Sequence, residues 1–177
     1  MKKSFILFSA IGLLYCSKES GESVSNENAL SAEDKAAALK IHNDARADVG
    51  VAALTWSDAL AADAAAWAQN MAEKEKMYHS GNAERPGQGE NLYYTTATDT
   101  ERSGRNASKA WYDEIQLYTY APIGSGENNF AAIGHYTQMV WKSTTEVGMA
   151  LAVSKSGATY VVARYSPPGN WQGETPY

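Results

Sequence analysis

The segment from residue 147 to residue 165 alternates large and small side chains and predicts a β-hairpin. One set of positions is large and the set between them is small: Val147, Met149, Leu151 and Val153 against Gly148, Ala150 and Ala152. A period of two places one set on each face of a strand. The turn "SKSGA" leads to a second strand, "TYVVARY", which ends at "SPPG" because proline cannot donate to a sheet.

An alanine-rich segment upstream, "TWSDALAADAAAWAQNMAEKEK", predicts an amphipathic helix. Its apolar stripe follows spacings of four, three and four: Leu60, Ala64, Trp67 and Met71. Ser57 or Asp58 can cap its first turn, and the alanines let a neighbouring element pack closely. Helices that precede an antiparallel hairpin indicate an α+β fold in which helices cover the sheet.

Two further helices are predicted. "SAED" resembles an acidic capping box that opens a helix over residues 32–48, with an apolar stripe at Ile41, Ala45 and Val49 and an end at Gly50. A third helix over about residues 105–118 carries Ala110, Trp111, Glu114 and Ile115 at helical spacing. Residues 78–108 are rich in glycine and proline and predict a long irregular stretch, and "YAPIGSGENN" predicts another loop.

The N-terminus has the pattern of a targeting segment. Lys2 and Lys3 precede an apolar run of 11 residues, "FILFSAIGLLY", which suits a signal peptide over residues 1–16 and is too short to span a bilayer. Cys16, the single cysteine, excludes an internal disulfide; it is either a lipidation site or an ordinary residue of the cleaved peptide. Polar residues 17–30 predict a flexible tether ahead of one domain over residues 31–177.

Charge excludes two classes of partner. The formal net charge is −5, and no basic stripe is present. We therefore expect neither nucleic-acid binding nor adsorption to anionic lipid. No segment after the signal peptide is apolar enough to cross a membrane.

Four polar residues stand beside apolar stripes or in glycine-rich loops: His79, Glu90, Glu114 and His135. Two imidazoles and two carboxylates could bind a divalent cation such as zinc, or hold a water between acids and bases. Their separations match no helical metal motif, and each residue taken alone also fits a solvated loop or the wet face of a helix. The residues by themselves leave both interpretations open.

Several motifs resemble the CAP superfamily, which comprises cysteine-rich secretory, antigen-5 and pathogenesis-related proteins. "GHYTQMVWKST" and "YVVARYSPPGNW" are similar to its two signatures, and "HNDARADVGVAALTWSDALAADAAAWA", "HSG", "GENLY" and "AWYDEIQLYTY" follow in the family's order. The resemblance covers about residues 35–177. It implies an α-β-α sandwich, a small and mostly antiparallel sheet between helical layers.

The resemblance also implies a cavity site. By motif, the family's two histidines and two glutamates fall on His79, Glu90, Glu114 and His135. It implies zinc or another divalent ion held chiefly by His79 and His135, with no organic cofactor. The segment after Gly134 should be helical, with His135 facing the cavity, while His42 should be structural.

For function, the resemblance implies an exported, monomeric binding protein. Yeast relatives export sterols or related lipids through an aromatic loop, which corresponds here to Leu117, Tyr118, Tyr120 and Ile123. A sterol-like or fatty-acid-like ligand is thus expected, although these side chains could equally cap the core. The alternatives are a metal-dependent hydrolase using the same cavity, and a surface interaction protein. The expected location is extracytoplasmic, either secreted or lipid-anchored.

Overall fold

The structure is a computed structural model and describes residues 28–97 and 99–177. The predicted signal peptide, Cys16 and residues 17–27 of the predicted tether lie outside the described residues. The helices and strands follow one another in this order: α1 (Ala32–Asp48), β1 (Thr55–Trp56), α2 (Asp58–Lys74), β2 (Gly89–Thr95), the 3₁₀ helix η2 (Thr100–Arg102), α3 (Ser103–Asp113), the 3₁₀ helix η3 (Glu114–Leu117), α4 (Phe130–Met139), β3 (Glu146–Val153) and β4 (Thr159–Ser166).

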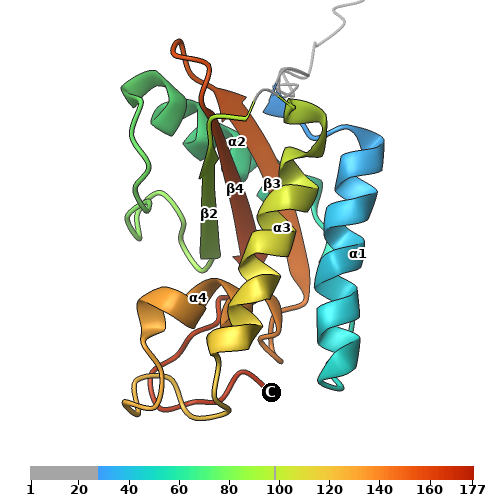
Figure 1. Ribbon diagram of the computed structural model, residues 1–177, viewed down its shortest axis with the longest axis vertical. Helices are drawn as coiled ribbons and strands as arrows, with labels where there is room; N and C mark the ends of the chain where they lie inside the picture. The colour runs from blue at the N-terminus through green and yellow to red at the C-terminus, as the bar shows by residue number, and fades with distance from the viewer. Residues whose placement is uncertain (1–27, 98) are drawn as a thin grey trace, which may run out of the picture.

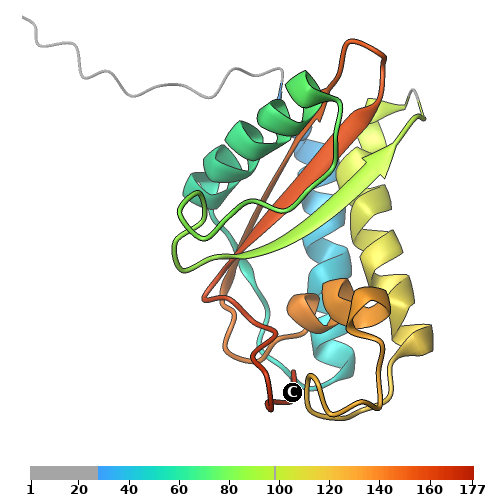
Figure 2. The ribbon, with the colours of Figure 1, turned by 90° about the vertical axis from the view of Figure 1, so that its left-hand side faces the viewer.

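The elements form three layers. The four strands pair in the order β1-β3-β4-β2, with β1 parallel to β3 and the other pairs antiparallel. Helix α2 covers one face of the sheet, and α1, α3 and α4 lie on the other (Figures 1 and 2). The predicted α-β-α sandwich is therefore confirmed. The parallel pairing of the short strand β1 is a detail that the sequence analysis did not predict.

The predicted hairpin is β3 and β4, and its two faces separate side chains by size. Ala150 and Ala152 pack with the buried alanines of α2, whereas Met149 and Leu151 pack toward the other helical layer. Gly148 lies so close to the start of α2 that a Cβ there would overlap the backbone of that helix. The small face thus exists because α2 sits directly on it.

The predicted caps of α1 and α2 form, but one of them differs in detail. The hydroxyl of Ser57 accepts from the backbone N–H of Leu60, and that of Ser31 accepts from the N–H of Asp34 at 3.1 Å. The Asp34 carboxylate does not return to Ser31 as a capping box requires. It accepts instead from the N–H groups of Gly104 and Arg105 at 2.7 and 2.8 Å, so it ties α1 to the start of α3.

The buried face of α1 was predicted wrongly. Ile41 and Val49 are only half-buried, whereas His42 and Arg46 are completely buried beside Ala45. Arg46 donates to the carbonyl oxygens of Ala52, Met139, Trp141 and Thr144 at 2.6–3.0 Å. A guanidinium has five donors, so one buried arginine can satisfy several loop carbonyls and hold α1 against the end of α4.

Four of the predicted segments differ from the structure in content or extent. The stretch expected to be irregular contains strand β2, and the third helix ends at Asp113 and continues as the 3₁₀ turn η3. Helix α4 begins at Phe130, four residues ahead of Gly134. Ordered contacts begin before residue 31, because Ala29 bridges to Ala150 on the edge of β3.

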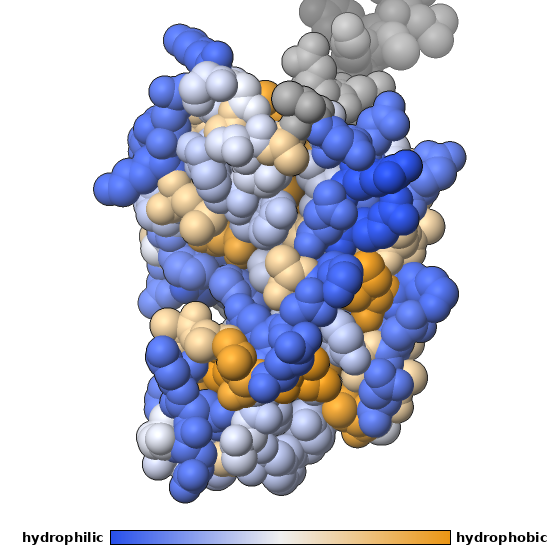
Figure 3. Space-filling model, viewed as in Figure 1, coloured by the Kyte–Doolittle hydropathy of each residue, from blue (hydrophilic) through white to orange (hydrophobic). Residues whose placement is uncertain are grey.

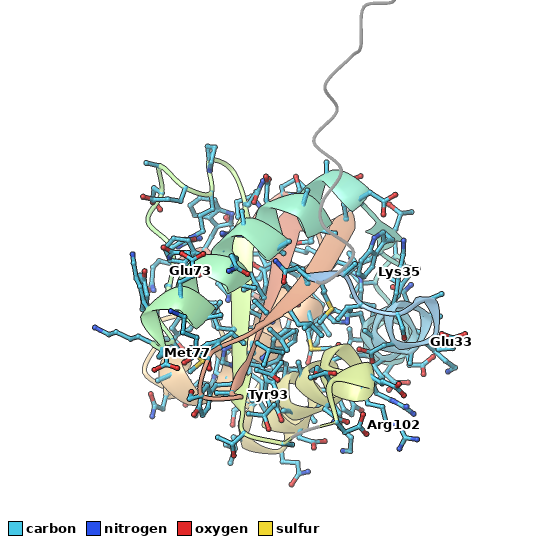
Figure 4. The ribbon with its side chains drawn as sticks, turned by 90° about the horizontal axis from the view of Figure 1, so that it is seen from above. Glu33, Lys35, Glu73, Met77, Tyr93 and Arg102 are labelled. Atoms are coloured by element: carbon cyan, nitrogen blue, oxygen red, sulfur yellow. The ribbon has the colours of Figure 1, made fainter. Side chains whose placement is uncertain are left out.

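The face of the molecule drawn in Figure 3 is mainly polar. Figure 3 shows apolar patches only between hydrophilic side chains on the face that α1 and α3 form. From above, the charged side chains of Glu33, Glu73 and Arg102 lie at the outer surface of the helical layers (Figure 4). Within the described ranges, none of the helices combines the length and the apolar character needed to cross a bilayer.

Candidate functional site

A cavity of about 460 Å³ opens between α4, the start of β2 and the loop that precedes β2. His79, Glu90 and His135 line it, as do Asn91 and Arg85. Three of the four residues predicted for the site therefore lie on one cavity, although up to 56 positions separate them in the chain. The fourth, Glu114, is not in the lining and contacts His135 from outside it.

His79 is held by Glu90 at the edge of the sheet. Nδ1 of His79 lies 2.6 Å from Oε1 of Glu90, which also accepts from the N–H of Ser80 at 3.0 Å. The other carboxylate oxygen accepts from the hydroxyl of Ser80 at 2.7 Å and pairs with Arg164 at 2.9 Å. Burial acts to raise the pKa of Glu90, but His79, Ser80 and Arg164 together lower it below its ordinary value. Glu90 is therefore ionised, and both of its carboxylate oxygens already have partners in His79, Ser80 and Arg164.

His135 is held by Glu114 in a matching way. Nδ1 of His135 lies 2.6 Å from Oε1 of Glu114, and Oε2 accepts from the backbone N–H groups of His135 and Tyr136 at 2.9 and 3.0 Å. The imidazole also stacks on Trp111, with ring centroids 6.0 Å apart. Glu114 at the start of η3 thus fixes both the ring and the backbone of α4.

The two histidines share one tautomer. A carboxylate accepts hydrogen bonds only, so Nδ1 of each ring carries a hydrogen, and in the neutral form of the ring Nε2 has a lone pair. The side chains of His79 and His135 are 60% and 31% exposed, so neither ring is sealed in the core. Within residues 28–97 and 99–177, no group of three or more His, Cys, Asp or Glu side chains could hold a metal ion. The two imidazoles stay the metal-ligand candidates of the sequence motifs, and each is hydrogen-bonded through Nδ1 to a carboxylate.

A chain of buried, hydrogen-bonded polar residues lies beneath the cavity, and only His42 in it was predicted from the sequence. His42 donates from Nδ1 to the carbonyl of Ala38 at 2.9 Å, and its Nε2 lies 2.8 Å from the hydroxyl of Tyr165. Asn91 donates to that hydroxyl oxygen at 3.0 Å and to the carbonyl of His135 at 3.1 Å. The structural role predicted for His42 is confirmed, and the chain links α1 to the site through β4 and β2.

Burial keeps this chain uncharged. Desolvation lowers the pKa of His42 to about 4, against a smaller opposing effect of the Ala38 carbonyl, and the nearby Arg46 lowers it further. Burial likewise raises the pKa of Tyr165 well above its ordinary value. His42 is therefore neutral at pH 7, which agrees with the tautomer that its two hydrogen bonds require.

Arg164 and Asn91 were both missed as parts of the site. Arg164 is the one charged residue in the apolar strand "TYVVARY", and a charge in such a run has to be paired. Asn91 follows Glu90 directly in "GENLY", where a buried amide needs partners. The sequence therefore shows that Arg164 and Asn91 need polar partners, but it does not show that these partners are Glu90, Tyr165 and His135.

The predicted lipid loop is only partly exposed. Leu117 and Tyr120 are 65% and 57% exposed, and Tyr118 is half-buried. Ile123 is 4% exposed and packs with the buried core, which fits the alternative that this residue caps the core. The ring of Tyr120 packs on Tyr177 at 5.1 Å, and its hydroxyl donates to the Tyr177 carbonyl at 2.7 Å.

Comparison with known proteins identifies the family to which the chain belongs. The family model described as CAP, the cysteine-rich secretory protein family, matches residues 39–165. A pathogenesis-related protein of the PR-1 type from Sambucus nigra is 38% identical over 136 residues, covering 77% of each chain. Pathogenesis-related protein 1A from Nicotiana tabacum is 37% identical over 139 residues, covering 78% of each chain.

Among solved structures, the crystal structure of NaASP2 with Zn²⁺ superposes with a TM-score of 0.75 at 26% identity. The match covers 86% of this chain and 88% of that one. The family match, the identities to the plant relatives and the shared fold lead to one conclusion. The chain is a member of the CAP, or cysteine-rich secretory protein, family.

Proposed function

We propose that this is an exported CAP-domain protein that binds a divalent cation in its cavity through His79 and His135 and acts as a binder, not as an enzyme. One observation carries the proposal. Each imidazole is hydrogen-bonded through Nδ1 to a carboxylate, His79 to Glu90 and His135 to Glu114, and both rings line one cavity. This is the usual arrangement of metal-ligating histidines, whose other ring nitrogen is held by a carboxylate.

The donor set fits a borderline cation. Neutral imidazole nitrogens suit zinc and similar ions, and two protein ligands leave the other positions to water. A bound ion would supply positive charge and open coordination positions to a ligand in the cavity. The zinc in the crystal structure of NaASP2 belongs to that protein, but the shared fold supports zinc as the first ion to try here.

Zinc titration of the full-length chain by isothermal calorimetry tests the proposal. We expect saturable binding that is lost in the His79→Ala/His135→Ala double variant. Glu33→Gln, which changes an exposed carboxylate on α1, is the matched control and should bind zinc unchanged. Equal affinity in the double variant and the parent would refute the cation site.

Hydrolysis is a less well supported use of the same cavity. Ser80, the hydroxyl next to His79, is buried, donates to Glu90 and accepts from Arg164 at 2.8 Å. A hydroxyl held in this way is not presented to a general base. A hydrolase assay with and without zinc, on the parent and the double variant, tests this alternative. Zinc-dependent turnover that the double variant loses would establish it.

A second binding function has its own observation. Leu117 and Tyr120 expose apolar surface on the segment that corresponds to the lipid loop of yeast relatives. We propose that they contact a sterol-like or fatty-acid-like ligand by burial of apolar area. Vesicles carrying labelled cholesterol or palmitate should lose label to the parent and less to Leu117→Ser/Tyr120→Ser. No transfer to the parent would exclude this function.

The proposed location is extracytoplasmic, with export directed by the predicted signal peptide. Release into the medium and acylation of Cys16 are the two alternatives. The mass of the mature N-terminal peptide distinguishes them, because a lipidated Cys16 would be the first residue and carry acyl chains. A surface role with a protein partner remains a third proposal, which pull-down with the purified chain tests.

A further inference from the structure

Arg85 is a charged side chain of the cavity lining that the cation proposal does not use. Its Nε donates to the carbonyl of Ser80 at 3.1 Å, and one terminal nitrogen, Nη1, donates to the carbonyl of Gln88 at 3.0 Å. Two backbone carbonyls of its own loop thus fix the guanidinium. The second terminal nitrogen, Nη2, has no hydrogen-bond partner among the described residues. The guanidinium of Arg85 is therefore held in place and still has N–H groups that can donate to a ligand.

The charge of Arg85 has no direct partner. In the described part of the chain, no carboxylate lies within 4.0 Å of its guanidinium. Glu90, the acidic residue in the lining, is paired with Arg164 and His79, and its side chain is 1% exposed. Asp63 and Glu84 lie in this region but are not part of the cavity lining, and Asp63 accepts from Gln88 at 2.6 Å.

The rest of the lining supplies neutral polar groups and one aromatic ring. Asn91, Gln138 and Asn170 contribute amides, and Phe130 contributes a half-exposed ring at the rim. The amide of Asn170 is fixed by the carbonyl of Gly134 at 2.8 Å and the hydroxyl of Thr137 at 2.7 Å. A few fixed polar groups around a concave volume of this size are typical of a small-molecule site.

We propose that Arg85 forms an anion subsite, so that the cavity binds a small polar molecule through its carboxylate or phosphate group. The proposal names the ligand class of the cavity described above and in that sense rests on the proposed function. A guanidinium matches both oxyanions with charge-assisted, paired hydrogen bonds. The whole chain has a net charge of −5, so an anion would be attracted by this local group and not by the general surface charge.

Calorimetry on the full-length, metal-free chain tests the subsite, with inorganic phosphate and acetate as separate probes at low ionic strength. We expect at least one probe to bind, and the comparison tells which oxyanion is preferred. Arg85→Gln should weaken that binding by about 10- to 100-fold, since it removes a charge-assisted contact. Arg105→Gln, an exposed arginine outside the cavity lining, should leave it unchanged.

A second measurement guards against a variant that fails to fold. In the parent chain, the Nε–Hε signal of Arg85 should shift during the phosphate or acetate titration, while that of Arg105 should not. If the full-length chain binds phosphate or acetate but does not bind zinc, the cation site is refuted and the anion subsite is retained. Absence of binding by both probes, or equal affinity in the parent and a folded Arg85→Gln, would overturn the inference.

Discussion

Glu114 contacts His135 at two points: Oε1 of Glu114 lies 2.6 Å from Nδ1 of the ring, and Oε2 accepts a hydrogen bond from the backbone N–H of the same residue at 2.9 Å. One carboxylate therefore sets the position of the α4 backbone and the direction of the imidazole together. Glu90, on strand β2, contacts the ring of His79 and accepts the backbone N–H of the next residue, Ser80. The site is built from two such pairs, and each pair can be tested separately.

The first prediction concerns Glu114→Gln. The amide can still accept from the backbone, but it no longer offers a carboxylate to Nδ1, so the ring loses orientation and basicity. We expect zinc affinity to fall about 10- to 100-fold, as is usual when the partner of a ligating histidine is removed. Calorimetry measures it, with the exposed Glu101→Gln as control. An unchanged affinity would mean that Glu114 serves only the fold.

The second prediction concerns Glu90→Gln, which leaves Arg164 buried without its counter-charge. Removing one partner of a buried ion pair lowers the free energy of unfolding by about 3–5 kcal/mol. Because the pKa of Glu90 is lowered in the folded state, ionised Glu90 stabilises the fold above the ordinary glutamate pKa. This stabilisation is lost as the pH falls through the pKa that Glu90 has in the folded protein.

Urea unfolding at pH 7 and at pH 3 measures both effects of Glu90→Gln. The variant should be much less stable than the parent at pH 7, and the gap should narrow at pH 3. Glu127→Gln, an exposed carboxylate in the loop before α4, is the control. A gap of the same size at both pH values would contradict the assignment of the charge to Glu90.

The third prediction concerns His42, whose pKa burial lowers to about 4. Between pH 6.5 and 4 the unfolded chain takes up a proton that the folded chain does not, so stability declines as pH falls through this window. At about 1.36 kcal/mol per pKa unit, the loss is about 3 kcal/mol. An NMR titration of the folded protein should find His42 neutral at pH 5; titration near 6.5 would refute the buried polar chain.

The fourth prediction concerns the contact between β3 and α2. Gly148→Ala places a methyl group against the backbone of α2, which cannot move as a side chain can. We expect a loss of at least about 2 kcal/mol in unfolding free energy, at the upper end of overpacking costs. Val153→Ala, at the exposed end of the same strand, should cost far less. Thermal unfolding compares the two variants.

Much of the fold was predictable because its signals are local. Ser57 caps α2 directly, and the alternation of Met149 with Ala150 already separated the two faces of the hairpin. The buried face of α1 was missed because it carries His42 and Arg46, and a hydrophobic pattern cannot identify polar residues whose partners lie elsewhere in the chain. Strand β2 was missed because Asn91 and Leu92 are both buried, so its burial does not alternate simply.

The site was predictable only in its residue types. The family motifs assigned His79, Glu90, Glu114 and His135 to one cavity, but they did not predict that Glu114 lies outside its lining. The division of roles depends on hydrogen bonds across 11 and 21 residues, as in His79 with Glu90 and His135 with Glu114. Arg85 was overlooked because nothing local distinguishes it from any other loop arginine.

Zinc titration of the full-length chain, followed by the ring nitrogens of ¹⁵N-labelled histidine in NMR spectra, measures the site most directly. We predict that Nε2 of His79 and of His135 shift together as zinc is added. Nδ1 of both rings should keep its hydrogen, and His42 should not change. Zinc bound through Nδ1, or spectra in which neither of the two cavity histidines responds, would contradict the assignment.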